Sequence, residues 1–222
     1  VEDDEGVPVH RLRQLRTLPG IARRRRQHHA APFPDPVTIV GLRRLVADFE
    51  PDVVHSYGWM SFSAAAALVG RRTPLLITVR DYAYSCANRT LMRDGKECSG
   101  PALTKCIGCA GRHYGAPKGW VAAIGVLASS ALLRRKVSAI HSISSYVRDV
   151  MRRDFLDDRL TGSRTSGHLI HDVIASMPLP QDDTGARKVR ERIAELPDEP
   201  FLLFIGALRQ VKGVAQLLAA YE

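Results

Sequence analysis

Apolar and polar positions along this chain follow two alternating patterns. Short, nearly continuous apolar runs alternate with longer stretches in which apolar residues recur with the period of a helix, about 3.6 residues. The first pattern is typical of strands buried on both faces, and the second of helices with one buried face. The predicted strands are 6–12, 52–57, 74–80, 136–144, 167–175 and 201–206, and the predicted helices are 37–49, 61–70, 118–135, 145–155 and 186–196.

Strands that alternate with helices predict an α/β fold, a Rossmann-like parallel sheet with helices on both faces. In such sheets ligands bind at the carboxyl ends of the strands. Candidate chemistry is therefore expected directly after Tyr57, Arg80, Ser144 and Gly206. Ser144 or Ser145 is the predicted N-cap of the helix over 145–155.

Composition and charge narrow the class of protein. With 45% hydrophobic and 25% charged residues among 222, the chain has the composition of a globular protein that buries a core. The formal net charge of +9 favours an anionic partner. The arginine-rich stretch 11–26 is predicted to be a solvated loop, with docking to an anionic lipid surface as the alternative.

No membrane span or export signal is predicted. The most apolar stretch, 120–133, is shorter than the roughly 20 residues that a spanning helix needs, and it is predicted to be a buried helix. The first residues lack the pattern of a signal peptide. A reducing, cytoplasmic location is therefore expected.

All four cysteines lie in one segment that follows the strand 74–80: Cys86, Cys98, Cys106 and Cys109. The segment is predicted to be a loop rich in Gly, Asp and Lys. Four thiolates suit tetrahedral zinc, which would organise a segment with too little apolar content to fold alone. Two disulfides, four ordinary thiols and a redox pair at Cys106 and Cys109 are the alternatives. A zinc ion with four cysteine ligands would be structural rather than catalytic.

A second motif, "FIGALRQVKGVAQLLAAY" at 204–221, combines a strand that ends in glycine, a basic loop and an apolar helix. Glycine allows a phosphate to approach the backbone, basic side chains neutralise it, and the helix N-terminus adds a positive dipole end. The predicted anion-binding residues are Gly206, Arg209, Lys212 and Gly213. A surface lysine at a helix start is the alternative interpretation.

"LLFIGALRQVKGVAQLLAAY" resembles the opening of the donor-binding domain of family 4 GT-B glycosyltransferases. "PDVVHSYGW", "PLLITVRDYAYSC" and "VSAIHSISSYVRDVM" are similar to three successive strand-to-helix junctions of that family's acceptor domain. The resemblance covers most of residues 37–222. It implies transfer of a sugar from a nucleotide-diphosphate sugar to a glycan or lipid-linked acceptor, with retention at the anomeric carbon and no catalytic metal.

The resemblance also implies roles for single residues. Lys212 matches the family lysine that neutralises the departing diphosphate, whereas the family arginine falls on Ala207, with Arg209 two residues further on. The implied catalytic residues on the acceptor side are Arg80, Asp81 and His55. A structural ion pair between Arg80 and Asp81, and a hydrogen-bonded core role for His55, are the alternatives.

The domains implied by the resemblance are 1–178, an acceptor-side domain without its first strand; 179–199, a linker and connecting helix; and 200–222, the first βα unit of a truncated donor domain. Such a fragment is expected to be inactive alone. Its parent would act in polysaccharide biosynthesis in the cytoplasm, with possible peripheral contact to the anionic inner face of the membrane.

The rival class is a zinc-stabilised nucleic-acid-binding module. Basic residues that are not interleaved with aromatics favour the transferase, with no nucleic-acid partner.

Overall fold

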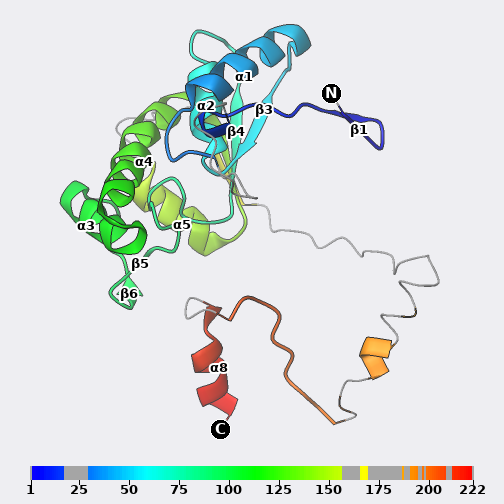
Figure 1. Cartoon of the computed structure of the whole chain (residues 1–222), viewed down its shortest axis with the longest axis vertical. Coiled ribbons are helices and arrows are strands. Elements are labelled where there is room, and N and C mark those ends of the chain that lie inside the picture. The colour runs from blue at the N-terminus through cyan, green and yellow to red at the C-terminus, as the bar shows by residue number, and fades with distance from the viewer. Residues whose placement is uncertain are drawn as a thin grey trace. The chain divides into compact units, whose positions relative to one another are not determined.

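The structure is a computed structural model that describes residues 2–17, 30–156, 166–169, 187, 191–194, 197, 199–208 and 212–221 (Figure 1). The chain divides into two compact units, Val1–His171 and Asp172–Glu222, here unit 1 and unit 2. The predicted boundary after residue 178 lies outside the described residues.

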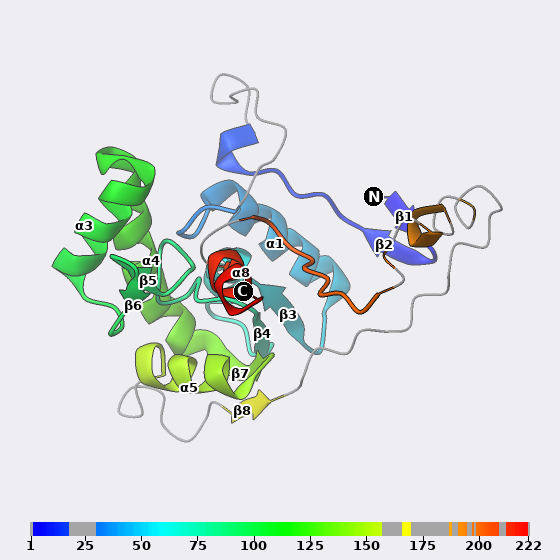
Figure 2. The same ribbon diagram turned by 90° about the horizontal axis from the view of Figure 1, so that it is seen from below.

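Unit 1 is built on a parallel sheet of four strands in the order β3-β4-β7-β8 (Figure 2). The strands are β3 (Val54–Tyr57), β4 (Leu75–Val79), β7 (Val137–Ser142) and β8 (Ser166–Leu169). Tyr57 pairs with Thr78, and Thr78 pairs with His141, so β3, β4 and β7 end at one edge of the sheet. The predicted α/β, Rossmann-like fold class is confirmed. Of the strand predicted over 167–175, the part 170–175 lies outside the described residues.

Helices lie around this sheet: α1 (Pro36–Phe49), α2 (Met60–Ala67), α3 (Leu103–Tyr114), α4 (Ala116–Lys136) and α5 (Ser145–Asp154). The Asp35 carboxylate caps α1 by accepting a hydrogen bond from the amide of Thr38. The Ser144 hydroxyl caps α5 in the same way, through the amide of Val147, so Ser144 is the N-cap. Helix α2 packs on β3 and β4, and α5 packs on β7 and β8.

The core of unit 1 collects side chains from the central strands and from α2, α4 and α5. Leu75 and Ile77 of β4, Phe62 of α2 and Leu133 of α4 are all 0% exposed. Removing an aliphatic or aromatic side chain of this size from water contributes about 1.5–3 kcal/mol to folding. Burial of these side chains explains why the apolar runs in the sequence predicted the sheet.

The segment that follows β4, residues 82–114 and here called the cysteine segment, is not the loop that the sequence predicted. It contains the hairpin of β5 (Met92–Arg93) and β6 (Lys96–Glu97), followed by α3. Asp94 and Gly95 turn the hairpin with φ of 50° and 76°, which suits a two-residue turn with positive φ at both positions. Leu103, Cys106, Ile107 and Ala110 recur at helical spacing along α3, but Gly108 and Gly111 have low helix propensity and obscure this pattern.

A small antiparallel hairpin forms the start of unit 1. Its strands are β1 (Glu2–Asp4) and β2 (Val7–Val9), and an ion pair between Arg11 and Glu2 at 2.7 Å fastens its end. The strand predicted within 6–12 is therefore confirmed over three residues. A short 3-10 turn, η1 (Leu15–Thr17), follows. Residues 18–26 of the arginine-rich stretch lie outside the described residues.

The described part of unit 2 contains α8 (Val214–Tyr221) and a helical piece at 191–194, within the predicted helix 186–196. The strand predicted over 201–206 is wrong, because no strand is formed there. Leu202 and Leu203 are each 65% exposed, and Ile205 is 85% exposed. An apolar run becomes a strand only beside another strand, and the described residues of unit 2 include none.

Helix α4 is longer than the apolar stretch 120–133 that the sequence marked. Its 21 residues, Ala116–Lys136, are long and apolar enough to cross a membrane by length and composition. The prediction that no segment has this length is therefore wrong. The prediction of a buried helix holds for one face, which includes Ala123, Val126 and Leu133, whereas Trp120, Val121 and Ile124 are about half exposed.

Candidate functional site

The carboxyl edge of the sheet gathers polar and aromatic side chains from the cysteine segment and from the loops after β3 and β4. Asp81 follows β4, Trp59 follows β3, and Arg89 comes from the turn after Cys86. These residues lie at the carboxyl ends of the strands, where open parallel α/β sheets bind their ligands. Ser144 and the start of α5 follow β7 at the same edge.

Asp81 and Arg89 form an ion pair at the end of β4. The Arg89 guanidinium donates two hydrogen bonds to Asp81 Oδ2, one of them from Nε at 3.0 Å. The other carboxylate oxygen, Oδ1, accepts a hydrogen bond from the amide of Ala83 at 2.9 Å. Both oxygens of Asp81 are therefore engaged, and the carboxylate orients the guanidinium.

Trp59 supports the other side of Arg89. The Arg89 Cζ atom lies 5.7 Å from the centroid of the Trp59 ring, within the range of a cation–π contact. The indole Nε1 donates to the carbonyl of Ala83 at 2.9 Å, which fixes the ring plane. Burial acts to lower the pKa of Arg89, but the hydrogen bonds and charge of Asp81 outweigh it and raise that pKa. Arg89 thus keeps a full positive charge in a side chain that is 37% exposed.

Arg89 was not predicted from the sequence. Its backbone φ is 64°, in the left-handed region that few non-glycine residues adopt. Leu91 and Asp94 share that conformation, with φ of 55° and 50°. Residues held in this way cluster at functional sites, but neither periodicity nor composition marks them in advance.

The predicted catalytic residues lie in two places. Arg80 directly follows β4 and is exposed at the same edge as Asp81. His55 lies inside β3, which continues for two further residues to Tyr57. Its Nε2 is 2.6 Å from Thr78 Oγ1, which is in turn 3.0 Å from His141 Nδ1. His55 therefore belongs to a hydrogen-bonded chain across β3, β4 and β7.

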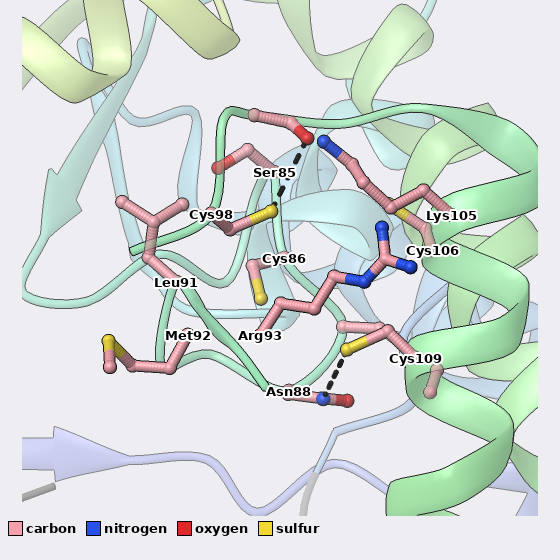
Figure 3. A pocket seen from close by; sticks show the side chains of 13 residues that line it. Ser85, Cys86, Asn88, Leu91, Met92, Arg93, Cys98, Lys105, Cys106 and Cys109 are labelled. Carbon is pink, nitrogen blue, oxygen red and sulfur yellow. Dashed lines mark hydrogen bonds between the residues drawn. The ribbon is translucent and has the colours of Figure 1, made fainter. Parts of the chain in front are cut away.

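The four cysteines come together around one small cavity (Figure 3). Cys86 lies in the turn after β4, Cys98 follows β6, and Cys106 and Cys109 lie one turn apart on α3. All four are free thiols and half-buried. Burial raises the pKa of the Cys109 thiol, and the nearby Cys86 raises it further. Within the described residues, no group of three or more His, Cys, Asp or Glu side chains is arranged to hold a metal ion.

In unit 2 the structure describes three of the four predicted anion-binding residues. Lys212 is exposed and immediately precedes α8, and Gly213 has φ of 73°. The amide of Leu217 donates to the Gly213 carbonyl, so α8 begins there. Gly206 lies in the exposed stretch 199–208, and Arg209 lies outside the described residues.

A parallel α/β sheet whose carboxyl edge holds a charged and aromatic cluster defines the class of Rossmann-like ligand-binding domains. Residues 1–161 match the model of a family described as the glycosyl transferase 4-like domain. Since the match spans more than half of the chain, the chain belongs to this family. A sugar donor and a sugar acceptor are therefore its partners in general terms. A comparison with curated proteins finds no match.

Proposed function

We propose that unit 1 is the acceptor-side domain of a retaining GT-B glycosyltransferase, and that unit 2 begins the donor-binding domain. The enzyme would move a sugar from a nucleotide-diphosphate sugar to a glycan or lipid-linked acceptor. Family membership supports the transfer of sugars, and the motif order along the chain supports the finer assignment. The rival function, a zinc-stabilised nucleic-acid-binding module, gains no support from the family match.

The observation that carries this proposal is the Asp81–Arg89–Trp59 cluster at the carboxyl edge of β3 and β4. An oriented guanidinium beside an aromatic ring suits an acceptor that carries both an anionic group and a sugar ring. Lipid-linked and acidic glycans combine these two features. In this proposal Arg89 binds the acceptor, Arg80 adds positive charge, and Asp81 is a positioning residue because its oxygens are already engaged.

His55 takes a secondary role in this proposal. Its ring nitrogen is bonded to Thr78, whose single proton can serve only one of its two histidine neighbours. The hydrogen bonds that Thr78 makes with His55 and His141 therefore link three strands just before their carboxyl ends. Its place inside the strand supports positioning of the sheet edge rather than contact with the reacting atoms.

On the donor side, Lys212 and the N-terminus of α8 would neutralise the departing diphosphate, with Arg209 as a further cation. Charge develops on that group as the bond to the sugar breaks, so preorganised positive groups stabilise the transition state. Side chains and backbone supply this charge in the proposal, without a catalytic metal. The net charge of +9 further supports anionic substrates and contact with the anionic cytoplasmic face of a membrane during polysaccharide synthesis.

The test is a transfer assay on the full gene product with labelled nucleotide-diphosphate sugars and lipid-linked or free glycan acceptors. Lys212→Ala should lower kcat about 10²–10³-fold, the usual effect of removing one group that stabilises developing negative charge. Lys118→Ala, at an exposed lysine of α4, is the control and should leave kcat unchanged. Normal activity in the Lys212 variant, or an inverted anomeric carbon in the product, would contradict the proposal.

A second pair of variants tests the acceptor side. Arg89→Ala should raise KM for an acceptor that carries a phosphate, with little change in KM for the donor. Arg89→Lys should restore part of the affinity, because lysine carries the positive charge but lacks the planar guanidinium that forms two parallel hydrogen bonds. An equal loss of affinity for charged and uncharged acceptors would show that Arg89 does not bind the anionic group.

A further inference from the structure

The cavity that the four cysteines border has the size of a single ion. Its volume is about 20 Å³, close to the space that one water molecule needs. Figure 3 shows side chains from the turn after β4, from the hairpin and from α3 around it. An organic ligand does not fit such a volume, whereas a metal ion does.

Two buried polar atoms at this cavity have no partner: Ser85 Oγ and Asn88 Oδ1. Ser85 is only 5% exposed, so water in the surrounding solvent does not satisfy it. Within the described residues, the other buried side-chain atoms without a hydrogen bond are Arg93 Nε, which lies 3.3 Å from Asp94 Oδ2 in an ion pair, and Arg134 Nε. Buried polar groups are normally paired, and a concentration of unpaired ones points to a ligand at the same place.

Two of the sulfur atoms accept hydrogen bonds from nitrogen. The Ala102 amide donates to Cys106 Sγ at 3.4 Å, and Asn88 Nδ2 donates to Cys109 Sγ at 3.3 Å. Arg93 and Lys105 line the cavity and bring positive charge. Hydrogen bonds of this kind to ligand atoms are typical of the outer shell of a metal site.

The cysteine segment also needs a cross-link for its shape. Its two strands have two residues each, and three of its non-glycine residues have positive φ. Such backbone conformations are strained for residues other than glycine and persist where the surroundings hold them. The contacts that hold Arg89 in this conformation include the hydrogen bond from its amide to the Cys86 carbonyl at 3.0 Å.

We propose that Cys86, Cys98, Cys106 and Cys109 bind one Zn²⁺ ion, which closes the cysteine segment onto α3 and thereby holds Arg89 at the edge of the sheet. Each thiol gives up its proton to solvent on binding, so four protons leave and the Zn²⁺ thiolate group carries a net charge of −2. No oxidation or reduction takes place. The sulfur atoms do not converge on one point in the structure, so the proposal requires the cysteine side chains to change rotamer on binding, with Zn–S bonds of about 2.3 Å. The site does not depend on the identity of the transferred sugar.

Native mass spectrometry of the full chain, incubated with zinc and desalted, tests the site. One zinc per chain is expected in the native spectrum, with the mass of the reduced, metal-free chain after acid denaturation. Cys98→Ser and Cys109→Ser should each weaken zinc binding at least about tenfold, as the loss of groups around a metal usually does. Met92→Leu removes a thioether from the same cavity wall and should keep the zinc.

Two results would overturn the proposal. A zinc-free chain whose denatured mass is lower by two hydrogens per bridge contains disulfides instead. A zinc-free chain with four reduced thiols contains ordinary cysteines. Either result excludes the metal site without affecting the proposed sugar transfer.

Because loss of a ligand can prevent folding, a second measurement uses the unmodified cysteines. Titration of the metal-free chain with Co²⁺ should give thiolate-to-cobalt charge transfer and strong visible bands that saturate at one equivalent. Thiol reagents should react slowly with the zinc form and quickly after chelation. Weak octahedral cobalt bands, or equal thiol reactivity in both forms, would contradict a site with four thiolates.

The link to Arg89 has its own readout. In a Trp120→Phe background, Trp59 is the single tryptophan of the chain, and its emission reports the guanidinium above its ring. Chelation should shift this emission while the far-UV circular dichroism of the sheet stays unchanged. Unaltered emission after complete loss of zinc would show that the metal does not position Arg89.

Discussion

The sheet core and the cysteine segment follow each other in the chain but are stabilised by different interactions. The core strand β4 is made of side chains that leave water almost completely, such as Leu75 and Ile77 at 0% exposure. The cysteine segment has short strands, half-buried thiols and ion pairs instead. Burial of apolar area is non-directional and tolerant, whereas polar contacts and thiol clusters require defined geometry. The sheet core therefore stabilises the fold, and the cysteine segment carries the polar and thiol side chains of the candidate sites.

Several contacts join these regions, and two of them involve buried groups. Tyr84 of the segment inserts into the core, with its ring edge-to-face against Phe62 at a centroid distance of 6.0 Å. Its hydroxyl is 2.8 Å from Ser61 Oγ. The second contact is the crossing of α3 and α4, where Gly119 lies against the backbone of Ala110. Substitutions in the core, at the α3–α4 crossing and in the cysteine segment should therefore change the free energy of unfolding by different amounts.

The largest loss of stability is expected in the core. Ile77→Ala removes a fully buried side chain and should lower the free energy of unfolding by about 2–5 kcal/mol. Val69→Ala, at a side chain that is 55% exposed after α2, should change it by less than about 0.5 kcal/mol. Urea unfolding followed by circular dichroism measures both. Equal costs at the two positions would contradict the assignment of the core.

The second largest loss of stability is expected at the α3–α4 crossing. Two glycines provide a test variant and a control there. A Cβ atom at Gly119 would lie 2.2 Å from the Ala110 carbonyl oxygen, so Gly119→Ala should push α4 away from α3 and cost about 1–3 kcal/mol. At Gly108 of α3 a Cβ would meet nothing within 4 Å, and Gly108→Ala should instead stabilise by up to about 1 kcal/mol. Thermal unfolding shows whether each substitution raises or lowers the stability. Two changes of the same sign would show that the helices do not cross closely here.

The sequence predicted the sheet core better than it predicted the cysteine segment. The four strands of the sheet, the helices α1, α2, α4 and α5 and the Ser144 cap follow from apolar periodicity and capping chemistry. Both are local properties of the chain. The strand predicted over 201–206 is wrong because an apolar run carries no information about its partner.

The candidate site was predictable only in part. Asp81 was a candidate through the family resemblance and its place after a strand, and the cysteines were candidates because all four lie in one short segment. Arg89 was missed, because its role depends on a left-handed backbone and on contacts with Asp81 and Trp59. Helix α3 was missed because its cysteines and glycines suggested a loop, although its apolar residues recur at helical spacing and pack against α4. Tertiary contacts decide the role of Arg89, and periodicity does not report them.

A smaller effect is expected where Tyr84 fastens the segment to the core. Tyr84→Phe keeps the ring contacts and removes the hydroxyl bonded to Ser61, at a cost of about 0.5–1.5 kcal/mol. Burial raises the pKa of Tyr84, so the ring stays neutral well into alkaline conditions. Tyr57→Phe, at a ring that is 47% exposed, is the control and should cost less. A neutral result for Tyr84→Phe would mean that the ring alone anchors the segment.

The smallest effect concerns Tyr146 of α5, which meets Glu97 of β6. A hydrogen bond to Glu97 raises the pKa of Tyr146 to about 12, against about 10 for an unperturbed tyrosine. Since the folded-state pKa is the higher one, the contribution to stability is complete below pH about 10 and is lost as the pH rises toward 12. The ring is 49% exposed, so this contribution is small.

Glu97→Gln should return the pKa of Tyr146 toward that of a free tyrosine, because the carboxylate charge that disfavours tyrosinate is gone. The difference in tyrosinate absorbance between the parent protein and Tyr146→Phe isolates this one ring during the titration. Asp48→Asn removes an exposed carboxylate from α1 and should leave the titration unchanged. If Glu97→Gln also leaves it unchanged, the hairpin does not touch α5 in solution. The cysteine segment would then be fastened to the sheet through Tyr84 and the α3–α4 crossing without help from its hairpin.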